Sequence, residues 1–324
     1  MQTDFFRRQF IKAALAAAAG VAISPQAFGQ SPVRPAPAAA KPVNVFAKCL
    51  QFLDYDQLGE TLARLGFDGA DLPVRPGGTV LPEKVKTDLP RAFKALQQQG
   101  RSIPMIVTAI NDPEDPHTEH ILGTASQLGI KYYRMGYFGY DKTKSVPQNL
   151  EVHKKTMEKL EKINRKYGIH GGYQNHSGTG VGAPVWDLYW LLQDRDPAYI
   201  GLQYDICHGV TEGGVSWPLA LKLMAPWIKT AAIKDFIWAR DSQNKKKPWR
   251  IKYVPLGEGM VDFNAYLTQY KALGLAGPVT VHFEYDLGGA EHGKTNPAMS
   301  LADMSAFLKK DLGWLRQQFR EHGI

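Results

Sequence analysis

The segment LEVHKKTMEKLEKINRKYGIHGGYQN, residues 150–175, places one helix directly before one strand. Its apolar residues recur at helical spacing from Leu150 to Tyr167, and Gly168 then supplies the left-handed conformation in which helices commonly end. The run from Gly171 to Asn175 that follows has the length of a buried strand. Repetition of such a unit is typical of an α/β protein with a parallel sheet.

The same alternation recurs from Pro42 onward and predicts eight strands, at 43–52, 69–74, 103–110, 132–137, 171–175, 200–206, 230–236 and 278–284. Helical patterns lie between them at 57–65, 89–99, 118–128, 150–167, 219–228 and 263–273, and an amphipathic helix at 301–319 follows the last strand. No GxGxxG follows the first strand, which removes the main signal for a dinucleotide fold. Eight strand-then-helix units predict a single (β/α)8 TIM barrel.

The first 29 residues are predicted to be a cleavable export signal. The segment Arg7-Arg8-Gln9-Phe10-Ile11-Lys12 precedes an alanine-rich apolar run, Ala13 to Ile23, that is too short to span a bilayer. It resembles the twin-arginine signal of bacterial exported proteins, and an ordinary secretory signal or a basic amphipathic anchor are the alternatives. We expect cleavage after Gly29 and export by the twin-arginine translocase to the periplasm or another exported location, with no stable membrane anchor.

The rest of the chain is expected to be a Pro- and Ala-rich linker at 30–42 and a barrel at 43–324. Removing residues 1–29 takes away three basic residues and one acidic residue, so the net charge falls from +8 to +6. The one dense basic cluster, Lys245–Lys247 with Arg250 and Lys252, has no interleaved aromatic residues, so we predict a solvated loop and no nucleic-acid partner. Cys49 and Cys207 are too few for a disulfide framework and are predicted to be buried apolar residues.

Polar side chains gather at the ends of five predicted strands. They are Arg134 with Tyr137, then Tyr173, Gln174 and His176, then Asp205 and His208, then Lys234 and Asp235 with Trp238, and finally His282 and Glu284. A barrel strand is expected to be nearly all apolar, and the carboxyl ends of all eight strands meet at one mouth, where active sites lie. We therefore expect a site there, in which each buried charge is compensated by another, by a divalent metal or by a polyol.

From about Val43 to Phe319 the chain resembles the xylose isomerase-like (sugar phosphate isomerase/epimerase) barrels, which include ketose 3-epimerases and inosose dehydratases. The resemblance rests on Gln174-Asn175-His176, Asp205-x-x-His208, Ile233-Lys234-Asp235, Leu256-Gly257-Glu258-Gly259 and Glu284. It implies a divalent metal held by a Glu after strand 5, an Asp after strand 6, a His on strand 7 and a Glu on strand 8. Asp205 and Glu284 match two of these ligands, whereas Gln174 and Ala232 stand where the first Glu and the His are expected.

Two versions of the centre follow from this departure. In the first, Gln174, Asp205 and Glu284 hold Mn²⁺, Mg²⁺ or Co²⁺, with water or substrate hydroxyls completing the shell. In the second, Lys234 shares a strand face with Ala232 and places its ammonium between the two acids, where it replaces the charge of the metal.

The resemblance also implies chemistry in which a proton moves on a carbon next to a carbonyl. His176 or Glu284 is then the base, Asp205 with a metal or Lys234 stabilises the oxyanion, and His208 orients a hydroxyl or acts as an acid. The residues assigned to substrate binding are Arg134, Tyr137, Tyr173, Asp235, Trp238, Glu258 and His282.

Export favours a non-phosphorylated sugar or keto-sugar as the substrate, because phosphorylated sugars are scarce outside the cytoplasm. The first hypothesis is therefore a sugar isomerase or epimerase. A 3-keto-glycoside lyase or dehydratase, which eliminates after the same proton abstraction, is the alternative. A second alternative is a non-catalytic sugar-binding protein, and the replaced ligands at Gln174 and Ala232 favour it.

Overall fold

The computed structural model describes residues 40–243, 246 and 248–324. The predicted export signal, most of the predicted linker and part of the basic cluster lie outside the described residues. Within those described ranges, no helix combines the length and the apolar character needed to cross a membrane.

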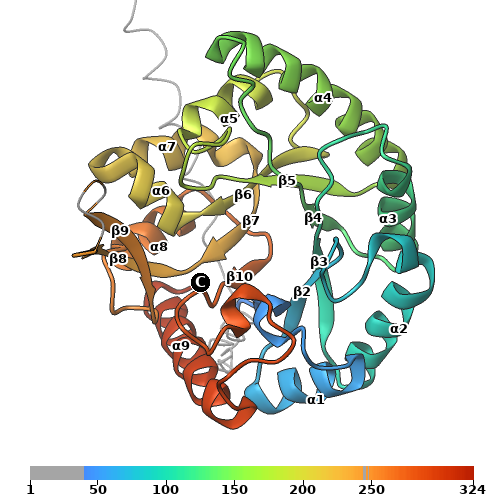
Figure 1. Cartoon of the computed structure of the whole chain (residues 1–324), viewed down its shortest axis with the longest axis vertical. Helices are drawn as coiled ribbons and strands as arrows, with labels where there is room; N and C mark the ends of the chain where they lie inside the picture. Colours follow the sequence, from blue (N-terminus) through green and yellow to red (C-terminus); the bar gives the residue numbers. More distant parts are fainter. Residues whose placement is uncertain (1–39, 244–245, 247) are drawn as a thin grey trace, which may run out of the picture. The chain divides into compact units, whose positions relative to one another are not determined.

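Eight parallel strands close into a barrel in the order β1-β10-β7-β6-β5-β4-β3-β2 (Figure 1). They are β1 (Val43–Phe46), β2 (Gly69–Pro73), β3 (Ser102–Val107), β4 (Tyr132–Arg134), β5 (His170–Gln174), β6 (Ile200–Asp205), β7 (Ile228–Ile233) and β10 (Val279–Val281). The last strand pairs in register with the first, Val43 opposite Val279, and this pairing closes the ring. The predicted (β/α)8 TIM barrel is confirmed.

Helices surround the barrel (Figure 1). They are α1 (Tyr55–Leu65), α2 (Val85–Gln98), α3 (Pro116–Gln127), α4 (Val146–Tyr167), α5 (Val185–Leu192), α6 (Ile206–Gly213), α7 (Trp217–Met224), α8 (Phe263–Ala272) and α9 (Leu301–His322). The side chain of Asp54 caps α1 and that of Ser145 caps α4, each in a reciprocal capping box. Gly66 and Gly168 end these two helices in the left-handed conformation, as their positions in the sequence predicted.

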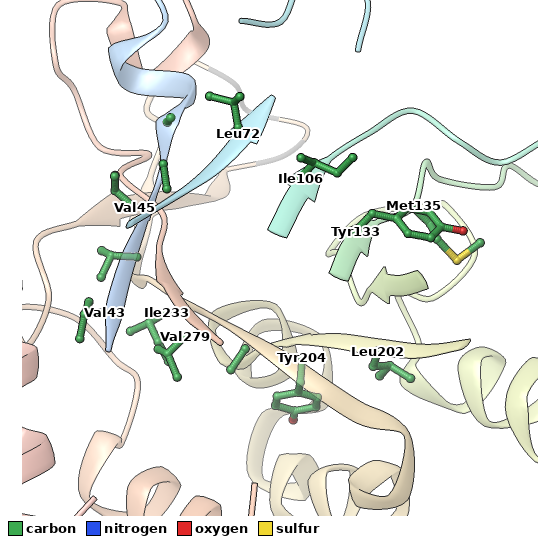
Figure 2. Close-up of a cluster of buried hydrophobic side chains, with 14 of the residues drawn as sticks. Val43, Val45, Leu72, Ile106, Tyr133, Met135, Leu202, Tyr204, Ile233 and Val279 are labelled. Carbon is green, nitrogen blue, oxygen red and sulfur yellow. The ribbon is translucent and has the colours of Figure 1, made fainter. Parts of the chain in front are cut away.

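Alternation along each strand separates two layers of side chains. Leu202 and Tyr204 point from β6 toward helices outside the barrel, and they belong to the buried apolar cluster of Figure 2. Polar groups occupy the other face, where Asp71 of β2 accepts a 2.6 Å hydrogen bond from Thr280 of β10 although β1 lies between those strands. Gln203 and Thr230 are buried as well. The expectation of nearly all-apolar strands is therefore wrong for the barrel interior, and these groups make it a polar environment.

Several predicted strands end earlier than expected, and two of these differences shape the site. The strand predicted at 43–52 ends at Phe46 and continues as a 3₁₀ turn, η1 (Ala47–Leu50), whose apolar side chains are buried. The strand predicted at 230–236 ends at Ile233, after which β8 (Asp235–Arg240) pairs with β9 (Trp249–Val254) in an antiparallel hairpin. An apolar run alone does not distinguish a strand from a buried turn, which explains both errors.

Candidate active site

Five ionisable side chains form what we call the ionic cluster: Lys48, Asp205, His208, Lys234 and Glu284. The Lys234 ammonium lies at its centre, 2.7 Å from His208 Nε2, 3.0 Å from Glu284 Oε2 and 3.2 Å from Asp205 Oδ2. Its side chain is only 2% exposed, so its three N–H donors meet three protein acceptors rather than water. This is the arrangement of the second predicted version of the centre.

Asp205 is held rigidly where β6 becomes α6. Its backbone N–H donates to Asn175 Oδ1 at 2.8 Å, and Asn175 Nδ2 donates back to the Asp205 carbonyl at 2.9 Å. One carboxylate oxygen accepts from the His208 backbone N–H and caps α6, which leaves the other directed at Lys234. The ends of β5 and β6 therefore fix the distance between this acid and the ammonium.

Charge compensation sets the ionisation of the cluster. Burial alone would lower the pKa of Lys234, but the carboxylates of Asp205 and Glu284 outweigh it and hold that pKa well above its usual value. Burial alone would raise the pKa of Glu284, but the ammonium groups of Lys234 and Lys48 hold that pKa well below its usual value. Lys48 Nζ lies 3.2 Å from Glu284 Oε1, so each oxygen of this carboxylate contacts one ammonium.

The two histidines next to Lys234 are neutral bases with assignable tautomers. Burial and the positive charge of Lys234 lower the pKa of both His176 and His208. Because an ammonium only donates, His208 Nε2 accepts from Lys234, and its Nδ1–H donates to Ser177 Oγ at 2.8 Å. His176 Nδ1 lies 2.9 Å from the Ser177 carbonyl, which only accepts, so the proton is on Nδ1. His176 Nε2 therefore carries a lone pair, and within the described ranges no hydrogen bond to it is formed.

The predicted metal ligands do not fit a divalent ion. Gln174 Oε1 accepts from Arg134 Nη1 at 3.1 Å and from the Tyr137 hydroxyl at 2.6 Å, while Gln174 Nε2 donates to Asp205. The amide oxygen thus faces Arg134, and the Lys234 ammonium lies between the two acids. A divalent cation between those acids would lie against a like charge in a buried setting.

A second group has the spacing of a metal site. Asp205, Cys207 and His208 each offer a ligand atom, and these atoms lie within 4.8 Å of one another. The His208 Nε2 lone pair accepts from Lys234, and burial raises the pKa of the Cys207 thiol. A thiol binds a metal as its thiolate, so this group is not poised for an ion either. Cys49 and Cys207 are both free and buried, as predicted.

Five residues assigned to substrate binding form no hydrogen bond with the ionic cluster among the described residues. Tyr173 is fully buried and bonds the backbone of Phe138 and Val181. Asp235 accepts backbone N–H groups of Gly257, Gly259 and Val261, so it holds a loop. Trp238 is 41% exposed on β8, and Glu258 pairs with Lys310 at the surface. His282 is buried against Phe46, with ring centroids 4.8 Å apart.

Hydrogen bonds or ring contacts connect the remaining assigned residues into one group. These residues are Arg134, Tyr137, Gln174, His176, Asp205, His208, Lys234 and Glu284. Sequence reasoning missed Lys48, which the 3₁₀ turn brings to Glu284, and Tyr253, whose ring lies 5.0 Å from the Lys234 ammonium. It also missed Arg75, which comes after Val74 in the loop that follows β2. A basic residue just after a barrel strand indicates a possible site residue, and this pattern could have identified Arg75. It could not identify Lys48, because the sequence predicted a strand over 43–52 that includes this residue.

The model of the xylose isomerase-like TIM barrel family matches residues 60–317. None of the curated proteins matches the chain. The fold is similar to that of 3-keto-D-glucoside 4-epimerase from E. coli, at 14% identity and a TM-score of 0.62, covering 86% of this chain and 99% of that one.

Two further solved structures are similar. A probable 3-DHS dehydratase from Bacillus anthracis has 12% identity and a TM-score of 0.59, with 85% of this chain and 98% of that one covered. A xylose isomerase-like TIM barrel protein from Mycobacterium smegmatis, in complex with magnesium, has 15% identity and a TM-score of 0.60, with 88% and 98% covered. At these identities the likeness shows the fold alone.

Proposed function

The chain belongs to the xylose isomerase-like TIM barrel family, and from that premise we propose that it is a sugar isomerase or epimerase. The reaction removes a proton from the carbon next to a carbonyl of a non-phosphorylated sugar or keto-sugar. The observation that carries this proposal is the pairing of a free imidazole lone pair on His176 with a fixed buried cation on Lys234.

His176 is the base in this proposal. Its Nε2 takes the proton from carbon, the electrons of the C–H bond form the enolate double bond, and negative charge develops on the carbonyl oxygen. Its ring centroid lies 4.0 Å from that of His208 and 5.2 Å from that of Tyr137, so its orientation is fixed from two sides. Glu284 is a poorer base, because both of its oxygens contact an ammonium.

The cations of the cluster stabilise the developing oxyanion. Lys234 supplies a fixed positive charge, and Asp205 and Glu284 hold it in place without a reorganisation step. Lys48 has one acceptor, Glu284, within the part of the chain that the structure describes, and is therefore the ammonium with N–H donors to offer a substrate oxygen. Since the donor set fits an ammonium rather than a divalent ion, we propose that no metal takes part.

A direct test is exchange of carbon-bound hydrogen with D₂O during incubation with a neutral 3-keto-glucoside. We expect His176→Gln to slow exchange by about 10²- to 10⁴-fold, the contribution typical of a positioned general base. His292→Gln, at a histidine that is 75% exposed and outside the cluster, is the matched control and should exchange at the wild-type rate. Absence of exchange in the wild-type protein would contradict the proposal and favour a sugar-binding protein.

A lyase or dehydratase that works through the same enolate is the second candidate. After proton abstraction, the C–O bond at the next carbon breaks and its electron pair leaves with the aglycone. The ionic cluster would stabilise the enolate in this reaction as well, because the lyase and the epimerase form the same intermediate. Aglycone release from the 3-keto-glucoside identifies the lyase, and formation of an epimer identifies the epimerase.

We also propose that the protein is exported by the twin-arginine route. The paired arginines Arg7 and Arg8 and the short apolar run after them support this proposal. Replacing both arginines with lysines should retain the protein inside the cell, and undiminished export of that variant would contradict the route.

A further inference from the structure

Two arginines beside the ionic cluster form no ion pair with any acid among the residues that the structure describes. We call Arg75 and Arg134 the guanidinium pair. Their guanidinium carbons lie 5.5 and 5.6 Å from the centroid of the same ring, that of Phe46. In the described ranges, no carboxylate oxygen lies within 4.0 Å of either guanidinium, whereas Glu284 and Asp205 are both paired with lysines.

Within the described ranges no carboxylate forms an ion pair with either guanidinium, although the charge of Glu284 acts to raise the pKa of Arg75. Arg134 is 6% exposed and has one protein acceptor among the described residues, the neutral amide oxygen of Gln174. Asp71 lies in the barrel interior, and burial raises its pKa to about 7, so it carries only part of a negative charge at neutral pH. Burial and the nearby charge of Arg134 lower the pKa of Arg75. A buried and a half-buried guanidinium side by side, neither with an ion-pair partner among the described residues, are costly unless a ligand supplies negative charge.

A pocket opens next to Arg75, which is half-buried. It lies at the carboxyl ends of β2 and β3, and its lining includes Ala109, Ile110 and Asn111. Each of the two acids in its lining has one oxygen that accepts a backbone N–H: Asp112 accepts from Glu114, and Asp115 accepts from His117 and caps α3. Arg75, one member of the guanidinium pair, therefore lines a space able to take part of a ligand.

Resting on the proposed function, we infer that the sugar substrate is an acid whose carboxylate binds between Arg75 and Arg134. A guanidinium fork matches a carboxylate in two parallel hydrogen bonds, and a neutral hydroxyl offers no such charge. The sugar ring then extends from Arg134 toward Tyr137 and His176, whose side chains are in contact. A hexuronate or a keto-aldonate has the required chemistry.

Calorimetric titration of the full-length protein with matched pairs tests the inference. The probes are glucuronate against glucose and galacturonate against galactose. We expect at least one acid to bind about tenfold or more tightly than its neutral partner, as charge-assisted hydrogen bonds predict. Arg75→Met should remove most of this preference without weakening the neutral sugar, and Arg75→Lys should keep part of it. Arg91→Met, at a surface arginine, is the matched control.

Each remaining outcome has a fixed meaning. Equal affinity for acid and neutral sugar, or no binding of either hexuronate, would overturn the inference. Tighter binding of glucose 6-phosphate than of glucuronate would overturn the carboxylate assignment, because the same pair would then be a phosphate site. Hydrogen exchange on the neutral 3-keto-glucoside is scored separately. Exchange without acid preference leaves the proposed function standing, and acid preference without exchange on a keto-aldonate, which has the inferred carboxylate, leaves only the binding site.

Discussion

The ionic cluster and the guanidinium pair lie at the same end of the barrel but differ in whether their charged side chains have ion-pair partners. In the cluster, Lys234 is only 2% exposed, and every contact it makes within 3.2 Å is to a protein acceptor. In the pair, Arg75 and Arg134 face one phenylalanine ring, and among the described residues no acid lies within ion-pair distance of either. The charges of the first region are paired within the protein, and we infer that those of the second are balanced by a bound ligand.

The difference separates catalytic groups from recognition groups. A charge that must be in place before the substrate arrives is best held by permanent partners, because no reorganisation is then needed during the reaction. A charge that selects the substrate is best left unpaired, because an internal carboxylate would compete with the carboxylate of the ligand. By this reasoning the ends of β5, β6, β7 and β10 carry the proposed chemistry, and the ends of β2 and β4 carry the inferred specificity.

Replacing Lys234 at the centre of the ionic cluster should have the largest effect on stability and on activity. Lys234→Met leaves the buried carboxylate of Asp205 without its cation, so we expect a loss of about 3 kcal/mol in the free energy of unfolding. Deuterium exchange should fall by at least about 10³-fold, because the oxyanion loses its fixed charge. Urea unfolding and the exchange assay measure the two effects.

Two further variants sharpen this test. Lys252→Met removes an exposed lysine from β9 and should change neither quantity. Combining Lys234→Met with Asp205→Asn removes the stranded charge, so the double variant should be less destabilised than the sum of the single variants. Additive losses would mean that the two side chains do not interact, against the 3.2 Å contact.

A smaller effect is expected from Asp71, on the side of the guanidinium pair. Its pKa of about 7 in the folded protein exceeds the usual value of about 3.9 in an unfolded chain. Between those values the folded state binds more protons, so ionisation of Asp71 reduces stability progressively as the pH rises from about 4 to 7. Asp71→Asn should therefore gain at least about 1 kcal/mol on the wild type between pH 5 and pH 8. A pH-independent difference in urea unfolding would show that Asp71 titrates normally.

The fold was predictable from the sequence because local residues mark where its helices and strands begin and end. Gly66 and Gly168 end helices where the sequence indicates, and all eight barrel strands fall within or overlap the predicted ranges. What failed was local geometry that depends on tertiary packing. The buried turn at Ala47–Leu50 reads as a continuation of β1, and the β8–β9 hairpin follows β7 after a single residue.

The site was predictable where residues follow strands, as for Asp205 and Lys234. The site was not predictable where contacts with residues distant in the sequence determine the orientation of a side chain. Asp235 resembles a site residue in sequence, yet three backbone N–H groups of a distant loop bind it. Lys48 shows the reverse, since only the three-dimensional structure brings it to Glu284, 236 residues away.

The central claim is that the ammonium of Lys234 replaces the divalent cation implied by the family resemblance. The most direct measurement is the rate of deuterium exchange on the 3-keto-glucoside after exhaustive dialysis against a chelator, with metal content determined on the same sample. We expect an unchanged rate in metal-free protein and no increase on adding Mn²⁺, Mg²⁺ or Co²⁺. Loss of exchange on dialysis, restored by one of these ions, would contradict it.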